Sequence, residues 1–194
     1  MVFSFILASG LSQAVELKGH QFPDTVKVGD KELSLNGAGL RIVVRYGMSF
    51  NVYVAGLYLE KHSSDSNAIL KNDEIKKFKS YYLRSVSVKD QTQPWRDAIA
   101  KNCFSDCSES KKKVLEFIRL LKRTKDGGQF DITFFPDRVE FQMQGENEPS
   151  RGIIKSAHFS KDLLAALIGE KPPTPELKKG LMGDGMPWTR AIKK

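Results

Sequence analysis

Residues 35–60, LNGAGLRIVVRYGMSFNVYVAGLYLE, constrain the fold more than any other part of this chain. β-Branched and aromatic residues fill two runs, at about 41–46 and 49–59, and this composition predicts two strands. Gly47 lies between the runs, so the strands are expected to form an antiparallel hairpin. Ahead of the first run, Gly37 and Gly39 let the backbone adopt a positive φ or pass close to another segment.

The loop of this hairpin decides which side chains face each other. A two-residue loop, 47–48, pairs Ile42 with Tyr53 and turns Arg41 to the other face. A three-residue loop, 46–48, pairs Arg41 directly with Tyr53. In that second register the guanidinium and the phenol are cross-strand neighbours, about 5 Å apart at Cβ, and can grip an oxyanion together.

Composition indicates one ordinary globular domain. The chain has 194 residues, of which 40% are hydrophobic and 28% charged. This is long enough to enclose a proper core. The formal net charge of +8 is compatible with nucleic acid or an anionic surface as a partner. The lysines, however, are scattered and do not alternate with aromatic residues as in a base-stacking platform, so we expect a solvated surface and no nucleic-acid binding.

The N-terminus resembles a secretory signal. Residues 2–11 form an apolar run that is too short to span a bilayer, and the small residues of Ser12-Gln13-Ala14 fit a cleavage site. We therefore expect a signal peptide at 1–14, a single mature domain at 15–194 and a periplasmic location. No basic residue precedes Lys18, so an N-terminal core strand remains the alternative. No other apolar stretch reaches spanning length, and no transmembrane segment is expected in the mature protein.

Periodicity predicts the remaining elements. The clearest amphipathic helix covers 108–122. A second helix is expected from Thr92 or Gln93 to Asn102, with Pro94 in its first turn. Further helices are expected at 64–70, at 159–169 and after Thr174, which would cap the last one; strands are expected at 25–35 as a hairpin, 76–86, 129–135 and 138–144. Since strands outnumber helices and the helices cluster in the second half, the pattern predicts an α+β fold with a mostly antiparallel sheet covered by helices.

Cys103 and Cys107 are the only cysteines. Four residues apart in one regular helix, their Cβ atoms would lie about 5–6 Å apart, which is poor geometry for a bridge. We predict a disulfide on the condition that the helix breaks between them, with Asp106 or a neighbouring serine capping a new helix. Two free thiols are the alternative.

Standard catalytic and cofactor motifs are absent from the sequence. His20, His62 and His158 lie in different predicted elements, and no nucleophile elbow, phosphate loop or zinc-protease motif occurs. Two cysteines with no histidine near them do not make a zinc site. We therefore predict neither a metal site nor a cofactor.

Several motifs, in order, resemble the chalcone isomerase domain. These are GAG-x-R at 37–41, AGLYLE at 55–60, a helix from Pro94-Trp95 to Asn102-Cys103, and LIGE followed by TPELK at 167–178. The similarity covers the chain from about Val26 onward and is greatest to bacterial, exported chalcone isomerase-like proteins. It implies an open-faced β-sandwich with a cleft between sheet and helices.

The resemblance also implies site residues. Arg41 and Asn102 match the catalytic arginine and asparagine of the plant enzymes, and they would be catalytic if this chain were an enzyme. Tyr53 and Ala166 stand where those enzymes have threonines, and Trp95 stands where they have a tyrosine. In the plant enzymes the hydroxyls at the positions of Tyr53 and Trp95 stabilise the developing oxyanion, and the threonine at the position of Ala166 holds the far phenolic ring with the asparagine. Because these residues depart from that pattern, we do not expect plant-type flavanone formation.

Fatty-acid-binding members of the superfamily are similar in carrying an arginine and a tyrosine at the positions of Arg41 and Tyr53. In those proteins the two side chains bind a carboxylate. The resemblance implies a ligand site that comprises Arg41, Tyr53, Trp95, Asn102 and Ala166. We expect binding of a small apolar carboxylate, such as a fatty acid. The alternatives are an intramolecular lyase of the chalcone isomerase type acting on a phenolic or enone substrate, and a structural protein in which Arg41 lies on the surface and Tyr53 in the core.

Overall fold

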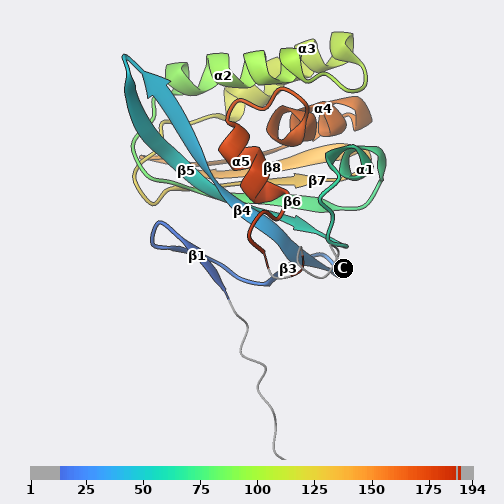
Figure 1. Cartoon of the computed structure of the whole chain (residues 1–194). Coiled ribbons are helices and arrows are strands. Elements are labelled where there is room, and N and C mark those ends of the chain that lie inside the picture. The colour runs from blue at the N-terminus through green and yellow to red at the C-terminus, as the bar shows by residue number, and fades with distance from the viewer. Residues whose placement is uncertain (1–13, 187, 189–194) are drawn as a thin grey trace, which may run out of the picture.

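A seven-stranded antiparallel sheet forms the framework of the molecule, for which a computed structural model describes residues 14–186 and 188 (Figure 1). Each strand pairs with the next along the chain. The strands are β3 (Thr25–Val28), β4 (Lys31–Arg45), β5 (Met48–Leu59), β6 (Lys76–Tyr82), β7 (Gln129–Phe134), β8 (Arg138–Gln144) and β9 (Pro149–Lys155). The predicted signal peptide at 1–14 falls almost wholly outside the described residues.

Helices cover one face of this sheet. They are α1 (Ser66–Lys71), α2 (Val88–Lys101), α3 (Cys107–Leu120), α4 (Ala157–Ile168) and α5 (Pro175–Leu181). The main apolar core lies between the sheet and these helices, and it includes Phe78, Phe117 and Phe130. The predicted α+β class is therefore confirmed.

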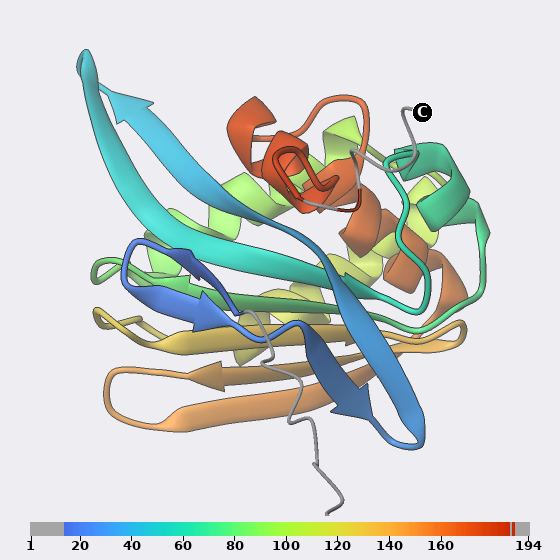
Figure 2. The same ribbon diagram turned by 60° about the horizontal axis from the view of Figure 1, so that its bottom comes forward.

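A smaller apolar layer lies on the opposite face of the sheet. The hairpin of β1 (Val15–Leu17) and β2 (His20–Phe22) packs there, as Figure 2 shows. Phe22 joins Leu33, Val54 and Tyr58 in this second cluster. Neither β1, β2 nor β9 was predicted, because all three are short or lack a clear apolar alternation.

Two expectations about helix starts are wrong. Helix α2 begins at Val88 and not at Thr92, so Pro94 lies inside it and not in its first turn. The missed signal is Ser87, whose hydroxyl accepts from the Asp90 amide at 3.1 Å and donates to the Asp90 carboxylate at 2.7 Å. Thr174 does precede α5, but its side chain makes no capping hydrogen bond.

The glycines before the key hairpin serve close packing. A Cβ on Gly39 would lie 2.6 Å from the Leu177 carbonyl oxygen, and one on Gly37 would lie 2.1 Å from the Gly180 carbonyl oxygen. Gly180 is equally tight against the Ala38 backbone of β4. Backbone therefore meets backbone where α5 crosses β4, and of the two options open for the glycines, close approach is the one observed.

Gly39→Ala tests this contact. The added methyl group has only backbone atoms to displace, so β4 or α5 must shift, and we expect a loss of about 1–3 kcal/mol in the free energy of unfolding. Urea denaturation measures it. Ser34→Ala on the same strand is the control and should change stability by less than about 0.5 kcal/mol. Equal urea midpoints for Gly39→Ala and the wild type would contradict the packing described.

Candidate functional site

A cavity of about 940 Å³ lies between the sheet and the helices. Its lining comes from the end of β4, the start of β5, the last residue of β6 with the segment 84–86 after it, most of α2, and the end of α4. This size is at the upper end of the range for small-molecule sites. The apolar side chains of its wall include Val43, Phe50, Val52, Trp95, Ala98, Ala166 and Leu167, and the polar side chains between them include Arg41, Tyr53, Tyr82 and Gln91.

A turn and a bulge together set the register at this site. The turn of the β4–β5 hairpin has two residues, Tyr46 and Gly47, both with positive φ, and Arg45 pairs with Met48. Continued without interruption, this register would pair Arg41 with Val52. A bulge between Arg41 and Ile42 adds one residue in β5, and Arg41 pairs with Tyr53 after all. The Arg41–Tyr53 pair that was expected for the three-residue loop is therefore observed, but neither of the two loops considered is: the turn is 46–47, and the bulge restores the pair.

The guanidinium of Arg41 is half-buried and holds no ion-pair partner among residues 14–186. Its Nη1 donates to the Thr174 hydroxyl at 2.6 Å, and that hydroxyl donates to the Ile42 carbonyl oxygen at 3.0 Å. The hydroxyl that was expected to cap α5 therefore fixes the guanidinium instead. The lining has two acidic residues, Asp90 and Asp97, and both are exposed. Asp90 accepts a hydrogen bond from Ser87, and Asp97 accepts one from Gln93.

Two phenols lie within electrostatic reach of Arg41. Burial raises the pKa of Tyr53, and the positive charge of Arg41 only partly opposes this. Burial also raises the pKa of Tyr82, whose hydroxyl donates to Gln91 at 3.1 Å. None of the hydrogen bonds found in the described part of the chain uses the Tyr53 hydroxyl. Both phenols therefore stay protonated at neutral pH, and Tyr53 has a donor to offer to a ligand.

Four of the five residues expected at the ligand site line the cavity, and Asn102 does not. Its side chain donates to the carbonyl oxygens of Ala98 at 2.9 Å and Lys171 at 2.7 Å, and accepts from the Lys171 amide at 2.7 Å. Asn102 thus joins the end of α2 to the segment after α4. Trp95 packs edge-on against Phe117, with ring centroids 5.2 Å apart.

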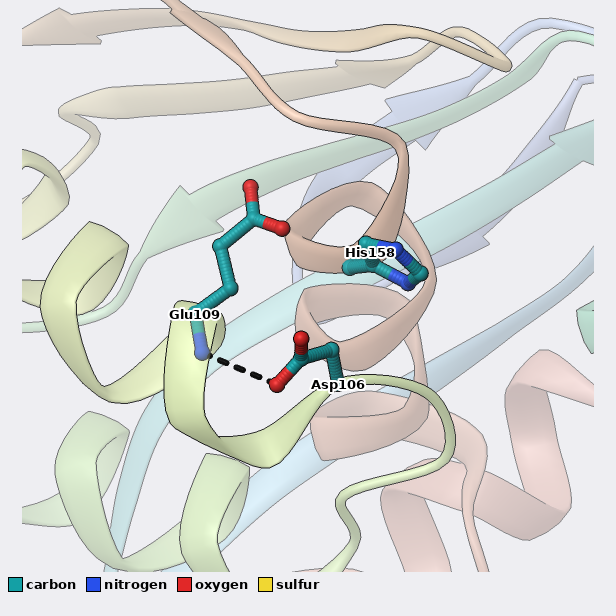
Figure 3. Close-up of side chains that lie close together, drawn as sticks. All are labelled: Asp106, Glu109 and His158. Carbon is teal, nitrogen blue, oxygen red and sulfur yellow. Dashed lines mark hydrogen bonds between the residues drawn. The ribbon is translucent and has the colours of Figure 1, made fainter.

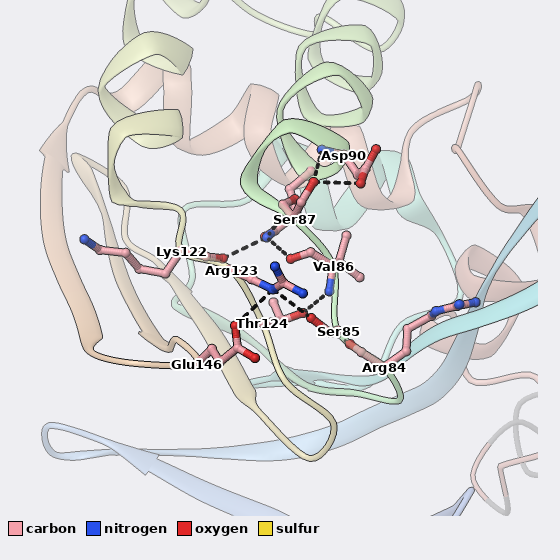
Figure 4. A network of polar contacts seen from close by, with 10 residues as sticks. Arg84, Ser85, Val86, Ser87, Asp90, Lys122, Arg123, Thr124 and Glu146 are labelled. Carbon is pink, nitrogen blue, oxygen red and sulfur yellow. Dashed lines mark hydrogen bonds and ion pairs between the residues drawn. The ribbon is translucent and has the colours of Figure 1, made fainter.

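One side of the cavity mouth is held by a polar network (Figure 4). The Thr124 hydroxyl accepts from the Val86 amide at 2.7 Å, and the Gln91 amide group donates to the Lys122 carbonyl oxygen at 2.8 Å. Arg123 donates to Ser85 at 3.2 Å. Residues 84–87, which carry the mouth residue Arg84, are therefore tied to the segment after α3. The sequence pattern did not predict Tyr82, Gln91 or Thr174 as site residues, because they lie in β6, in α2 and just before α5, far apart along the chain.

Away from the cavity, the connection from α2 to α3 holds the two cysteines. Cys103 and Cys107 form a disulfide with Cα atoms 5.6 Å apart, and the helix does break between them. The new helix is capped by Asp106, as expected among the alternatives. Buried Asp162 of α4 fixes this connection by accepting from the amides of Phe104 and Ser105, each at 2.7 Å.

One group of side chains in the described residues has the composition of a metal site. Its members are Asp106, Glu109 and His158, and their potential ligand atoms lie within 4.8 Å of one another (Figure 3). Asp106 already serves as the cap of α3, and His158 contacts the Ser105 hydroxyl. Local helix structure thus accounts for Asp106, and the group lies outside the cavity lining.

The fold and the cavity define an α+β protein in which a cavity lies between an antiparallel sheet and the helices on one of its faces. The family model described as chalcone isomerase-like matches residues 14–183, and the chain belongs to that family. No curated protein matches the sequence.

One similar solved structure is the fatty-acid-binding protein of Arabidopsis thaliana. It has 17% sequence identity and a TM-score of 0.68, and the match covers 90% of this chain and 98% of that one. At this identity the likeness concerns the fold.

No helix of residues 14–186 is both long and apolar enough to cross a membrane.

Asn102→Ala tests the structural role of this side chain. The change removes three hydrogen bonds and leaves the Lys171 backbone without its partners, so we expect a loss of about 1–3 kcal/mol in the free energy of unfolding. Urea denaturation again provides the measurement, with Gln93→Ala on the exposed face of α2 as the control. If both variants unfold at the wild-type midpoint, Asn102 does not hold the end of α2.

Proposed function

We propose that this protein binds a small apolar carboxylate, such as a fatty acid, in the cavity between sheet and helices. The observation that carries the proposal is Arg41: a half-buried cation inside a largely apolar cavity, with no carboxylate partner among the described residues. A partly buried charge without a counter-ion is unfavourable, and an anionic ligand would reduce that cost.

The donors around Arg41 suit a carboxylate. A guanidinium offers a planar fork of N–H groups, and Thr174 occupies only Nη1. The Tyr53 hydroxyl supplies another donor, and its raised pKa keeps the proton in place. Trp95 and Ala166 make the adjacent wall apolar, in keeping with an acyl chain. The similar Arabidopsis thaliana protein is a fatty-acid-binding protein by name, which supports the same ligand class.

We do not expect plant-type flavanone formation. Trp95 puts an indole where the resemblance implies a tyrosine hydroxyl, so the stabilisation of a developing oxyanion would be weaker. Ala166 lacks the hydroxyl that would hold the phenolic ring of a plant-type substrate. The alternative function, an intramolecular lyase acting on a phenolic or enone substrate, also needs Arg41. Turnover of a chalcone by the wild-type protein would favour it.

We also propose a periplasmic location. The apolar run at 2–11 supports export, and the bridge between Cys103 and Cys107 suits an oxidising compartment. Fractionation of cells that make the full chain, with N-terminal sequencing of the mature protein, tests this.

The decisive comparison is between a fatty acid and the matched fatty alcohol. For hexadecanoic acid, Arg41→Gln removes a charge-assisted contact, and we expect a loss of about 1.5–3 kcal/mol, or roughly ten- to a hundredfold in Kd. For hexadecanol the same variant should bind almost as the wild type does. Isothermal titration or displacement of a fluorescent fatty acid measures both affinities.

Arg84→Gln at the exposed mouth is the matched control, because it removes the same charge without touching the proposed carboxylate site. Tyr53→Phe should weaken the acid by roughly 0.5–1.5 kcal/mol and leave the alcohol less affected. An equal loss for acid and alcohol in Arg41→Gln would overturn carboxylate recognition. Failure of the wild type to bind either molecule would overturn the ligand class.

A further inference from the structure

The tip of the β4–β5 hairpin is an exposed apolar surface beside the cavity mouth. Tyr46 is 86% exposed, Val44 68% and Met48 57%, and these three make up nearly half of the large apolar side chains that are exposed in the described residues. Figures 1 and 2 show the tip extending past the edge of the sheet. We refer to Val44, Tyr46 and Met48 as the hairpin tip.

Folding gives no reason for a tyrosine at the turn. Tyr46 has φ of 52°, followed by Gly47 at 74°, and a turn of this kind favours Asn-Gly or Asp-Gly. A tyrosine with positive φ is unfavourable by roughly 1–2 kcal/mol. Its ring has almost no packing in return, since its closest recorded ring contact is the Arg45 guanidinium at 5.3 Å. A strained, exposed aromatic residue indicates a role outside the fold.

Three basic residues, which we call the basic collar, line the cavity mouth beside this tip. Arg45, Arg84 and Lys89 are exposed and line the mouth of the cavity, and the Arg84 guanidinium lies 4.8 Å from the centre of the Phe50 ring. The two acids of the lining already accept hydrogen bonds on α2. An apolar tip with a tyrosine and a basic collar matches the interface of an anionic bilayer, where aromatic rings lie at the headgroup level and basic residues contact acidic lipids.

We propose that the hairpin tip docks on an anionic lipid bilayer. Tyr46, Val44 and Met48 enter the headgroup region, and the basic collar faces the acidic lipids. In this orientation the cavity mouth meets the membrane, so an apolar carboxylate passes between bilayer and cavity without crossing water. The transfer of a carboxylate between bilayer and cavity rests on the proposed function, whereas docking of the tip on the bilayer needs no ligand in the cavity.

Vesicle flotation with the ligand-free protein tests the docking. The wild type should float with vesicles of equimolar phosphatidylcholine and phosphatidylglycerol, and far less with phosphatidylcholine alone or at high salt. The double variant Tyr46→Asn/Met48→Ser should bind the anionic vesicles at least about tenfold more weakly. Asparagine suits the positive φ of the turn, so the variant should fold. Ile153→Ser is the matched control, since Ile153 is 60% exposed on β9, and it should float like the wild type.

Absence of wild-type flotation with the anionic vesicles would overturn the proposal, as would equal flotation of the double variant. A concentration-dependent dimer lost in the double variant, without vesicle binding, would assign the tip to a second copy and also overturn it. The double variant should keep the wild-type affinity for hexadecanoic acid in solution while accepting the acid from vesicles more slowly. If neither protein binds the acid, the proposed function fails while the flotation result still decides the docking.

Discussion

The close contact between α5 and β4 is the constraint on which the site depends. Gly37, Gly39 and Gly180 bring two backbones together where any side chain would separate them. This contact holds Thr174, at the start of α5, against Arg41 and the Ile42 carbonyl. The sequence motif GAG-x-R thus serves both packing and binding. Its glycines let α5 pack closely on β4, and Thr174 before α5 then fixes the guanidinium of Arg41. A cation held in this way in an apolar cavity is already arranged for an anionic ligand before one arrives.

Sequence patterns predicted the elements with strong periodicity and the antiparallel pairing of β4 with β5, but not the turn and the bulge that set the register of that pair. Arg41 does pair with Tyr53, one of the two pairings considered, but through a two-residue turn at 46–47 and a bulge that adds one residue in β5. A bulge has no periodic signature when both strands are rich in β-branched and aromatic residues. Ser87 and Asp90 mark the start of α2, but Pro94, which is typical of a first helical turn, favoured a later start.

The candidate site was predictable only in part, because a cavity is assembled from distant segments. Arg41, Tyr53, Trp95 and Ala166 do line it. Asn102 was expected beside them. A polar side chain at the end of a helix can hydrogen-bond either to a ligand or to nearby backbone groups, and the sequence around it does not show which of the two it does. Thr174 was identified for a capping role that it does not perform, and Gln91 gave no signal at all. The chemistry of single residues was therefore clearer in the sequence than their partners were.

The central claim is that Arg41 meets the carboxylate of a bound ligand. The most direct measurement is carbon NMR of hexadecanoic acid, isotope-labelled at its carboxyl carbon and bound to the wild-type protein, followed against pH. A guanidinium beside the carboxylate favours its charged form, so the bound carboxyl should stay ionised well below the pH at which the free acid titrates. In Arg41→Gln that depression should disappear. A wild-type carboxyl that titrates at or above the pH of the free acid would contradict the account, because it would place the headgroup away from Arg41.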